Sequence, residues 1–193
     1  MDELYARIPL VPAEREIRLL LLLPELVNGQ AACVISKSSL DDEVEYRGLS
    51  YAWGDRATTK TILVTDCDLC GSDDDFVGTP VEVTVSLEGA LRNMREEGRA
   101  VRLWVDAVCI NQDDLNERSS QVMIMDQIYG RAIRTLIWLG EGSQNNELAV
   151  RFVYDVAQNG MPATSNRRAP KHWQPCLRSC NAHGGIAYGS SRS

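Results

Sequence analysis

The sequence predicts an α/β fold with a mainly parallel sheet and flanking helices. Between residues 81 and 160, strand-like and helix-like segments alternate three times. This alternation is typical of βαβ crossovers, which place neighbouring strands parallel to each other. Residues 101–110 form a largely apolar run rich in valine, as expected of a central buried strand. The length of 193 residues suits one domain with a sizeable core.

The first 45 residues are expected to form strands that lead into this domain. Residues 16–23 and 31–36 are short apolar runs, and the turn sequence VNGQ lies between them. We therefore expect an N-terminal β-hairpin region, which either extends the sheet or packs beside it. The strands of the domain itself are expected at 46–54, 60–66, 81–85, 101–110 and 133–140.

Helices are expected between and after the later strands. Ser86 is a suitable N-cap for a helix over 87–98, and Gly98 is a natural stop. A second helix is expected over 114–129, and a third over 145–160. The inner face of the second helix is expected to carry Leu115, Val122, Met125 and Tyr129.

The charge and the apolar pattern exclude several classes of protein. The net charge is −7 and the isoelectric point is about 4.9, so no basic face is available to neutralise many phosphates of a nucleic acid. Acidic residues follow Met1, and the leucine run between Arg18 and Pro24 is too short for a secretory signal. No apolar run is long enough to span a membrane. We expect a cytoplasmic protein that binds neither nucleic acid nor membranes.

The six cysteines are expected to be thiols in such a compartment. Cys67 and Cys70 form the only closely spaced pair near the domain, and an isolated pair rarely completes a zinc site. Cys109 has no base near it in the sequence, so we expect a buried apolar thiol and not a nucleophile. No metal site is predicted.

Composition divides the chain into three parts. Residues 1–45 hold the leading strands, residues 46–160 hold the domain, and residues 161–193 form an irregular tail. From Val156 to the C-terminus there is no Asp or Glu, whereas five Lys or Arg and both histidines lie there. The tail is expected to be a disordered linker or an aberrant continuation.

A polar cluster follows the central strand. Asp106 is expected at the carboxyl end of that strand, where ligands bind in open α/β sheets. Asn111, Gln112 and Glu117 follow in the next loop and helix start, where they can bind a ribose or an amide. The structural alternative is that Asp114 and Glu117 form a capping box, or that Glu117 pairs with a base.

A second polar group ends the strand over 46–54. Trp53 and Asp55 can form another wall of the same crevice and contact a ligand. The alternative is structural, because a packed Trp followed by Gly54 and Asp55 is typical of a strand that ends in a turn.

Four blocks together resemble the fungal heterokaryon-incompatibility (HET) domain. They are YRGLSYAWGD (46–55), SLEGALRNMR (86–95), LWVDAVCINQDDLNERSSQVMIMDQIYGRA (103–132) and LIWLGE (136–141). The third block is long and unusual, which makes the resemblance specific. Small departures are Ser86 in place of Asn and Val105 in place of Ile, and residues 67–80 resemble an insertion. Family members usually continue further, so the resemblance implies a truncated HET domain.

The resemblance implies a role in fungal self/non-self recognition that triggers programmed cell death, through self-association or protein partners. HET domains have also been compared with TIR domains, which have a flavodoxin-like sheet and include NAD-cleaving enzymes. By that remote analogy Glu117 acts on the nicotinamide ribose of NAD, in a pocket lined by Trp53, Asp106 and Asn111. The enzyme alternative is thus an NAD(P) glycohydrolase, and a further alternative is an inactive HET fragment.

These alternatives make different predictions about geometry. Clustering of Glu117, Asp106 and Asp55 around one cavity would favour the enzyme. Separate and solvated positions would favour a signalling module.

Overall fold

The computed structural model describes residues 2–66 and 76–141. The expected helix over 145–160, the tail and most of the loop over 67–80 lie outside these residues. The elements in chain order are α1 (Asp2–Arg7), the 3-10 helix η1 (Pro12–Glu14), β1 (Glu16–Val27), β2 (Gln30–Ser39), β3 (Arg47–Tyr51), β4 (Thr59–Asp66), β5 (Thr79–Thr84), α2 (Val85–Met94), β6 (Val101–Trp104), α3 (Asp106–Cys109), α4 (Leu115–Met123), α5 (Met125–Arg131) and β7 (Arg134–Trp138).

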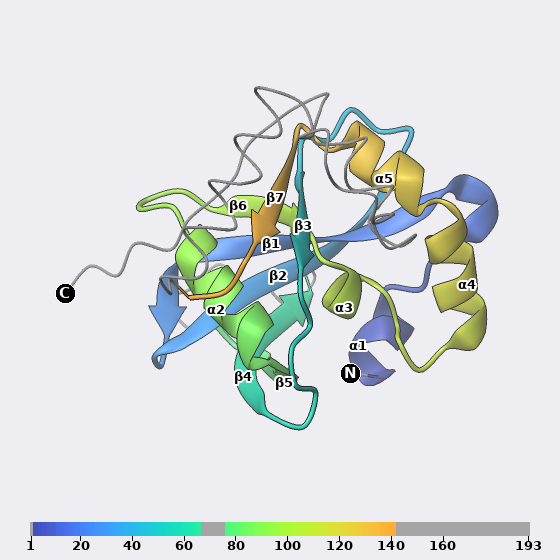
Figure 1. The fold of residues 1–193 in the computed structure, drawn as a ribbon. Coiled ribbons are helices and arrows are strands. Elements are labelled where there is room, and N and C mark those ends of the chain that lie inside the picture. Colours follow the sequence, from blue (N-terminus) through green and yellow to red (C-terminus); the bar gives the residue numbers. More distant parts are fainter. Residues whose placement is uncertain (1, 67–75, 142–193) are drawn as a thin grey trace, which may run out of the picture.

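The strands of the described residues form one mixed sheet in the order β5-β4-β2-β1-β6-β3-β7 (Figure 1). β1 is antiparallel to β2 and β6, and β4 is antiparallel to β5. Parallel pairs join β2 to β4 and β3 to both β6 and β7. The two longest ladders, those of β1 with β2 and of β4 with β5, are antiparallel. The expectation of a mainly parallel, flavodoxin- or TIR-like sheet with flanking helices is therefore wrong.

The N-terminal hairpin explains the difference. The hairpin forms as expected, and Asn28 and Gly29 turn it with positive φ angles of 51° and 77°. Positive φ at both central residues suits a two-residue hairpin turn. The hairpin occupies the centre of the sheet, because β1 and β2 separate β4 from β6, and Leu19, Leu20 and Leu22 are buried there. A continuous apolar run fits a central strand, whichever direction its neighbours take.

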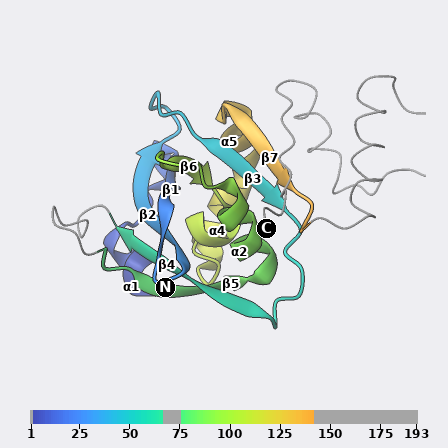
Figure 2. The same ribbon diagram turned by 90° about the vertical axis from the view of Figure 1, so that its left-hand side faces the viewer.

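Helix α2 forms where the apolar spacing predicts a helix, but it begins at Val85 and ends at Met94, before the expected stop at Gly98. Thr84 is the N-cap, two residues before the expected Ser86, and its hydroxyl accepts a hydrogen bond from the Leu87 backbone N–H at 3.3 Å. Threonine is a favoured N-cap for this reason. The helix ends at Met94 and packs against β2, β3, β4 and β5, which come from both ends of the sheet. Figure 2 shows the sheet curving around this helix.

The expected helix over 114–129 is two helices, α4 and α5. The chain breaks at Ile124, whose φ of −108° and ψ of 8° are not helical. The expected inner face is wrong for Leu115 and Val122, which are 64% and 54% exposed. Tyr129, in contrast, packs against the core as expected. No helix of residues 2–66 and 76–141 is long and apolar enough to cross a membrane.

The core lies between α2, α3 and the sheet. Close packing of Tyr129 against β3 holds in place the strand that leads to Trp53. Trp104 is fully buried and meets the Tyr129 ring edge-on, with centroids 5.2 Å apart. The Tyr129 hydroxyl donates to the Leu49 carbonyl at 3.0 Å. The same ring lies over Gly48, where an added Cβ would stand 2.7 Å from Tyr129 Cδ1.

Candidate functional site

β6 ends at Trp104 and Asp106 begins α3, so the expected strand over 101–110 is wrong beyond residue 104. One carboxylate oxygen accepts from the Ala107 N–H at 2.8 Å, and the other accepts from the Trp53 indole Nε1–H at 3.2 Å. Burial is the main influence on this carboxyl and raises its pKa, and the two hydrogen bonds partly oppose that rise. β3 and β6 are parallel neighbours, so their carboxyl ends bring Trp53 and Asp106 together.

Trp53 is the centre of a small stack. The guanidinium of Arg56 lies 4.3 Å from its ring centroid, and the Tyr51 ring stacks on it with centroids 6.4 Å apart. The first contact is a cation–π interaction. The Tyr51 hydroxyl is buried without a hydrogen-bond partner among the described residues, and burial raises its pKa. The stack joins β3 to α3 through the Trp53–Asp106 hydrogen bond.

Asp55 has a turn-forming position. It is exposed, and its carboxylate accepts from the Ala57 N–H at 2.9 Å and from the Thr58 hydroxyl at 3.0 Å. The Ala57 bond, followed by that from Thr58, lowers the pKa of this carboxyl. The geometry is that of an aspartate that stabilises its own turn.

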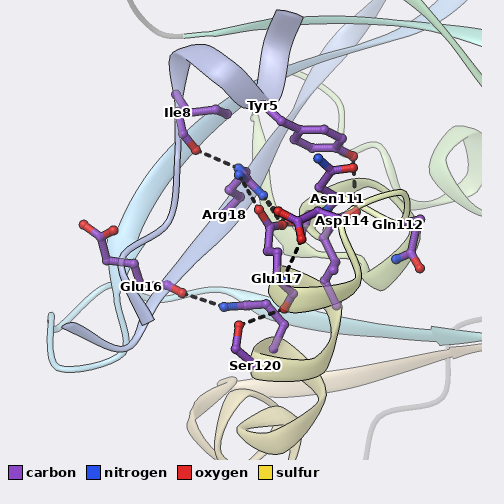
Figure 3. Close-up of polar contacts among 12 residues, drawn as sticks. Tyr5, Ile8, Glu16, Arg18, Asn111, Gln112, Asp114, Glu117 and Ser120 are labelled. Atoms are coloured by element: carbon purple, nitrogen blue, oxygen red, sulfur yellow. Dashed lines mark hydrogen bonds and ion pairs between the residues drawn. The ribbon is translucent and has the colours of Figure 1, made fainter. Parts of the chain in front are cut away.

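Glu117 lies in the first turn of α4 and makes a buried ion pair with Arg18 of β1 (Figure 3). The guanidinium donates to the two carboxylate oxygens, with N–O distances of 2.6 and 3.0 Å. The Arg18 side chain is 0% exposed and that of Glu117 is 13% exposed. This two-pronged geometry is the strong form of an arginine–carboxylate contact.

The remaining groups of Arg18 and Glu117 are also engaged. Arg18 donates to the carbonyls of Ile8 at 2.9 Å and Cys109 at 3.2 Å, and its guanidinium lies 4.7 Å from the centroid of the Tyr5 ring. One Glu117 oxygen also accepts from the Asn111 N–H at 2.6 Å. The ion pair therefore fastens the N-terminal segment and β1 to the loop between α3 and α4.

The loop that carries Asn111 and Gln112 is organised by its own side chains. Gln112 donates to the Asp106 carbonyl at 2.8 Å, and Asn111 accepts from the Asp113 N–H at 3.2 Å. Asp114 is the N-cap of α4 and accepts from the Asn116 and Glu117 N–H groups. The capping role is thus taken by Asp114, while Glu117 turns inward to Arg18.

A pocket of about 430 Å³ opens beside the ion pair. One wall is mainly apolar and comes from the chain between Tyr5 and Pro12. The other wall carries polar groups of the α3–α4 loop and of α4. Asp106 and Asp55 do not line this pocket. The structure therefore brings Glu117 together with Asn111, and Asp106 together with Trp53, but it does not gather Glu117, Asp106 and Asp55 around this pocket.

Two residues of the site, Arg18 and Tyr5, were not predicted. Arg18 had a signal in the sequence, since it stands inside the apolar run EIRLLLLL, and a charge within a buried strand needs a partner. Tyr5 had none, because its role depends on where α1 packs. Its hydroxyl donates to the carbonyls of Val108 at 3.0 Å and Ile110 at 3.3 Å.

In the part of the chain that the structure describes, neither a reactive thiol nor a cluster of metal ligands is present. Cys109 is fully buried, as expected, and its sulfur accepts from the Val105 N–H at 3.3 Å. Burial raises the pKa of this thiol to about 12. No group of three or more His, Cys, Asp or Glu side chains in residues 2–66 and 76–141 converges as metal ligands.

Comparisons with known proteins agree with the sequence blocks. Residues 46–183 match the model of the family described as heterokaryon incompatibility protein (HET). The "Heterokaryon incompatibility protein 6, OR allele" of Neurospora crassa is 30% identical over 175 residues, which are 88% of this chain and 25% of that relative. The chain thus spans about a quarter of the relative's length. No solved structure matches the chain.

Proposed function

The chain belongs to the heterokaryon incompatibility (HET) family, and from that premise we propose that it acts in fungal self/non-self recognition and triggers programmed cell death. The observation that carries this proposal is the family match, which extends over most of the chain. We also propose that the protein works in the cytoplasm, because hyphal fusion mixes the contents of two cells there.

We propose that the domain acts by self-association or by binding protein partners. The acids of the candidate site support this view, because each has structural partners. Glu117 is held by Arg18, Asp106 by Trp53, and Asp55 by its own turn. They do not gather around one pocket, as the enzyme would require, but only Asp55 is exposed to solvent. The NAD(P) glycohydrolase alternative, with Glu117 as its acid, stays a prediction that no particular contact favours.

The proposal can be tested by expressing the full chain from an inducible promoter in a filamentous fungus. Uptake of a vital dye by the hyphae measures cell death. We expect the wild type to kill the cells, and Asp106→Ala to kill far fewer because the link between β3 and α3 is lost. Asp126→Ala, which changes an exposed acid on α5, is the matched control and should kill like the wild type. Circular dichroism of each purified protein checks that it is folded.

The same cultures separate the two alternatives. NAD is measured in extracts of cells that express the wild type or Glu117→Gln. Death at an unchanged NAD level supports the signalling proposal. A fall in NAD that requires Glu117 supports the enzyme instead. Soluble, folded wild-type protein that leaves the cells alive would contradict the proposed function.

A further inference from the structure

Helix α4 is attached to the body by its polar side. Glu117 turns inward to Arg18. Gln121, one turn further on, is 1% exposed, and its amide donates to the Glu16 carbonyl of β1 at 2.8 Å. Polar side chains thus occupy the face that a surface helix normally fills with apolar ones.

The opposite side of α4 is apolar and exposed. Leu115, Val122 and Met123 are 64%, 54% and 80% exposed. Their spacing of seven and eight residues places them on one face of the helix, and exposed Ser119 lies between them. We call the surface formed by Leu115, Ser119, Val122 and Met123 the outer face of α4. A contiguous exposed apolar surface on an element of this kind is typical of an interaction site.

We propose that the outer face of α4 binds the same face of a second copy of this chain, with the two α4 helices antiparallel about a two-fold axis. The pattern of the face is self-complementary. An axis at Ser119 places Leu115 of one copy against Val122 and Met123 of the other. The small side chain of Ser119 lets the two backbones approach where they cross. A two-fold contact of identical surfaces is the commonest form of oligomer.

The distribution of charge favours this face over others. The chain carries a net charge of −7, so two copies repel each other over most of their surfaces. Glu117 is the only acid of α4, and it is turned inward to Arg18. Arg118 is exposed on the helix instead. The outer face itself therefore carries no acid, whereas exposed Asp113, Asp114 and Asp126 lie beyond its two ends. Salt screens the repulsion between these flanking acids and between the two acidic copies, so added salt should strengthen the contact.

The size of the face limits the strength of the contact. α4 has nine residues. At 1.5 Å per residue this corresponds to a length of about 14 Å. A standard interface buries about 800 Å² on each partner, and one helix of this length supplies less. We therefore expect a reversible, weak dimer.

The inference deepens the proposed function and rests on it for its biological meaning. Its test is the oligomeric state of the purified chain. Failure of the dimer to form is therefore distinguishable from a failure to cause cell death.

The first test is sedimentation velocity of the full chain over a wide range of concentration. We expect a monomer–dimer equilibrium that tightens as salt is added. Met123→Glu should raise the dissociation constant by about tenfold or more, because it places an acid against Leu115 of the other copy in an apolar contact. Val77→Glu is the matched control, since Val77 is also apolar and 74% exposed, but belongs to the segment before β5 and not to α4. It should leave the equilibrium unchanged.

The geometry of the pair is tested by cross-linking. Cys67, Cys70, Cys176 and Cys180 are first replaced by Ser, which leaves the two buried thiols of Cys33 and Cys109. Ser119→Cys in this background should give a disulfide-linked dimer on mild oxidation, because the two copies meet at that residue. Glu97→Cys, in the exposed turn before β6, is the control and should give far less.

The oxidation of Met123 by peroxide distinguishes a second copy from another covering group. We expect Met123 to be oxidised readily at low protein concentration and to be protected at high concentration. Protection that does not depend on concentration would mean that residues of the same chain cover the face, and this would overturn the proposal. A monomer at every concentration, or a dimer that Met123→Glu leaves intact, would overturn it as well.

Discussion

Two segments of this chain have different roles, because one carries the family motif and the other forms the centre of the sheet. The motif segment, residues 46–141, carries the blocks that identify the family and most residues of the candidate site. The N-terminal segment, residues 2–45, lies outside the family match, yet its β1 and β2 form the centre of the sheet. Without them β4 and β5 have no connection through the sheet to β6, β3 and β7.

The comparison shows that a family motif and a folding unit need not have the same boundary. The Neurospora relative supports this point, because 88% of the chain cannot fit within residues 46–193, so its alignment includes part of the N-terminal segment. Besides the sheet, the Arg18–Glu117 ion pair also joins the two segments directly. Experiments that cut or weaken this connection test how far the segments depend on each other.

Removal of the N-terminal segment should have the largest effect. A chain that begins at residue 46 should fail to fold, because β6 loses its antiparallel neighbour β1 and β4 loses β2. Circular dichroism and thermal unfolding measure the result. A chain that begins at residue 10, which keeps the hairpin but loses α1, is the control and should retain a cooperative transition at lower temperature. A stable chain from residue 46 would show that the motif segment folds alone.

Loss of the buried Arg18–Glu117 ion pair should have the second largest effect on stability. Arg18→Met leaves the Glu117 carboxylate buried without its partner, which should lower the free energy of unfolding by about 3–5 kcal/mol. Urea unfolding measures this change. Arg118→Met, on the exposed side of the same helix, should change stability by less than about 0.5 kcal/mol. Adding Glu117→Met to Arg18→Met should recover much of the lost stability. If Arg18→Met and Arg118→Met lowered stability equally, the structural role of the ion pair would be contradicted.

A smaller effect is expected where the motif segment packs against itself. Gly48→Ala puts a methyl group 2.7 Å from Tyr129 Cδ1. Overpacking of this kind costs about 1–3 kcal/mol. Gly130→Ala is the matched control, because an added Cβ meets nothing within 4 Å there. Gly130 lies in α5, so this change should stabilise the protein by about 0.5–1 kcal/mol. Thermal unfolding measures the stability of both variants. Equal melting temperatures would mean that the β3–α5 contact tolerates the added methyl group.

The smallest effect concerns the Asp106 carboxyl and depends on pH. Its pKa is raised in the folded protein, so the folded state holds this proton more tightly than the unfolded state does. Its contribution to stability should therefore fall as pH rises from the unfolded pKa of about 4 through the folded pKa. Asp106→Asn lacks this dependence, and the stability of the wild type relative to the variant should decrease over that window. Urea unfolding of both proteins across acid to neutral pH measures the difference, and a constant difference would contradict it.

Local features of the fold could be predicted because their causes lie close together in the sequence. The hairpin of β1 and β2 follows from two apolar runs around an Asn-Gly turn. Helix α2 follows from its apolar spacing, although its N-cap is Thr84 and not the expected Ser86. The meeting of Trp53 and Asp106 follows from strand ends that share one edge of a sheet. For the hairpin and the helix a few neighbouring residues determine the outcome, whereas the Trp53–Asp106 contact also requires β3 and β6 to be parallel neighbours.

The arrangement of the sheet could not be predicted in the same way. Periodicity identifies a strand but does not choose its neighbours, so β1 was not recognised as the partner of β6. The error over α4 has a related cause. Leu115 and Val122 have the spacing of a buried face, but Arg18 and Glu16 of β1 bind the polar side of the helix and turn the leucine and valine outward. The partner of Glu117 lies 99 residues earlier in the chain.

The central position of β1 also affects how the chain is made. The hairpin is complete once residue 39 has left the ribosome, but β6 follows only at residues 101–104. At about 5–20 residues per second, the apolar edge of β1 waits several seconds for its partner. Pairing over so long a sequence separation is also slow in itself. Newly made chains are therefore most exposed to aggregation during that interval, and a chaperone that binds apolar strands would protect this protein mainly through Leu19–Leu22.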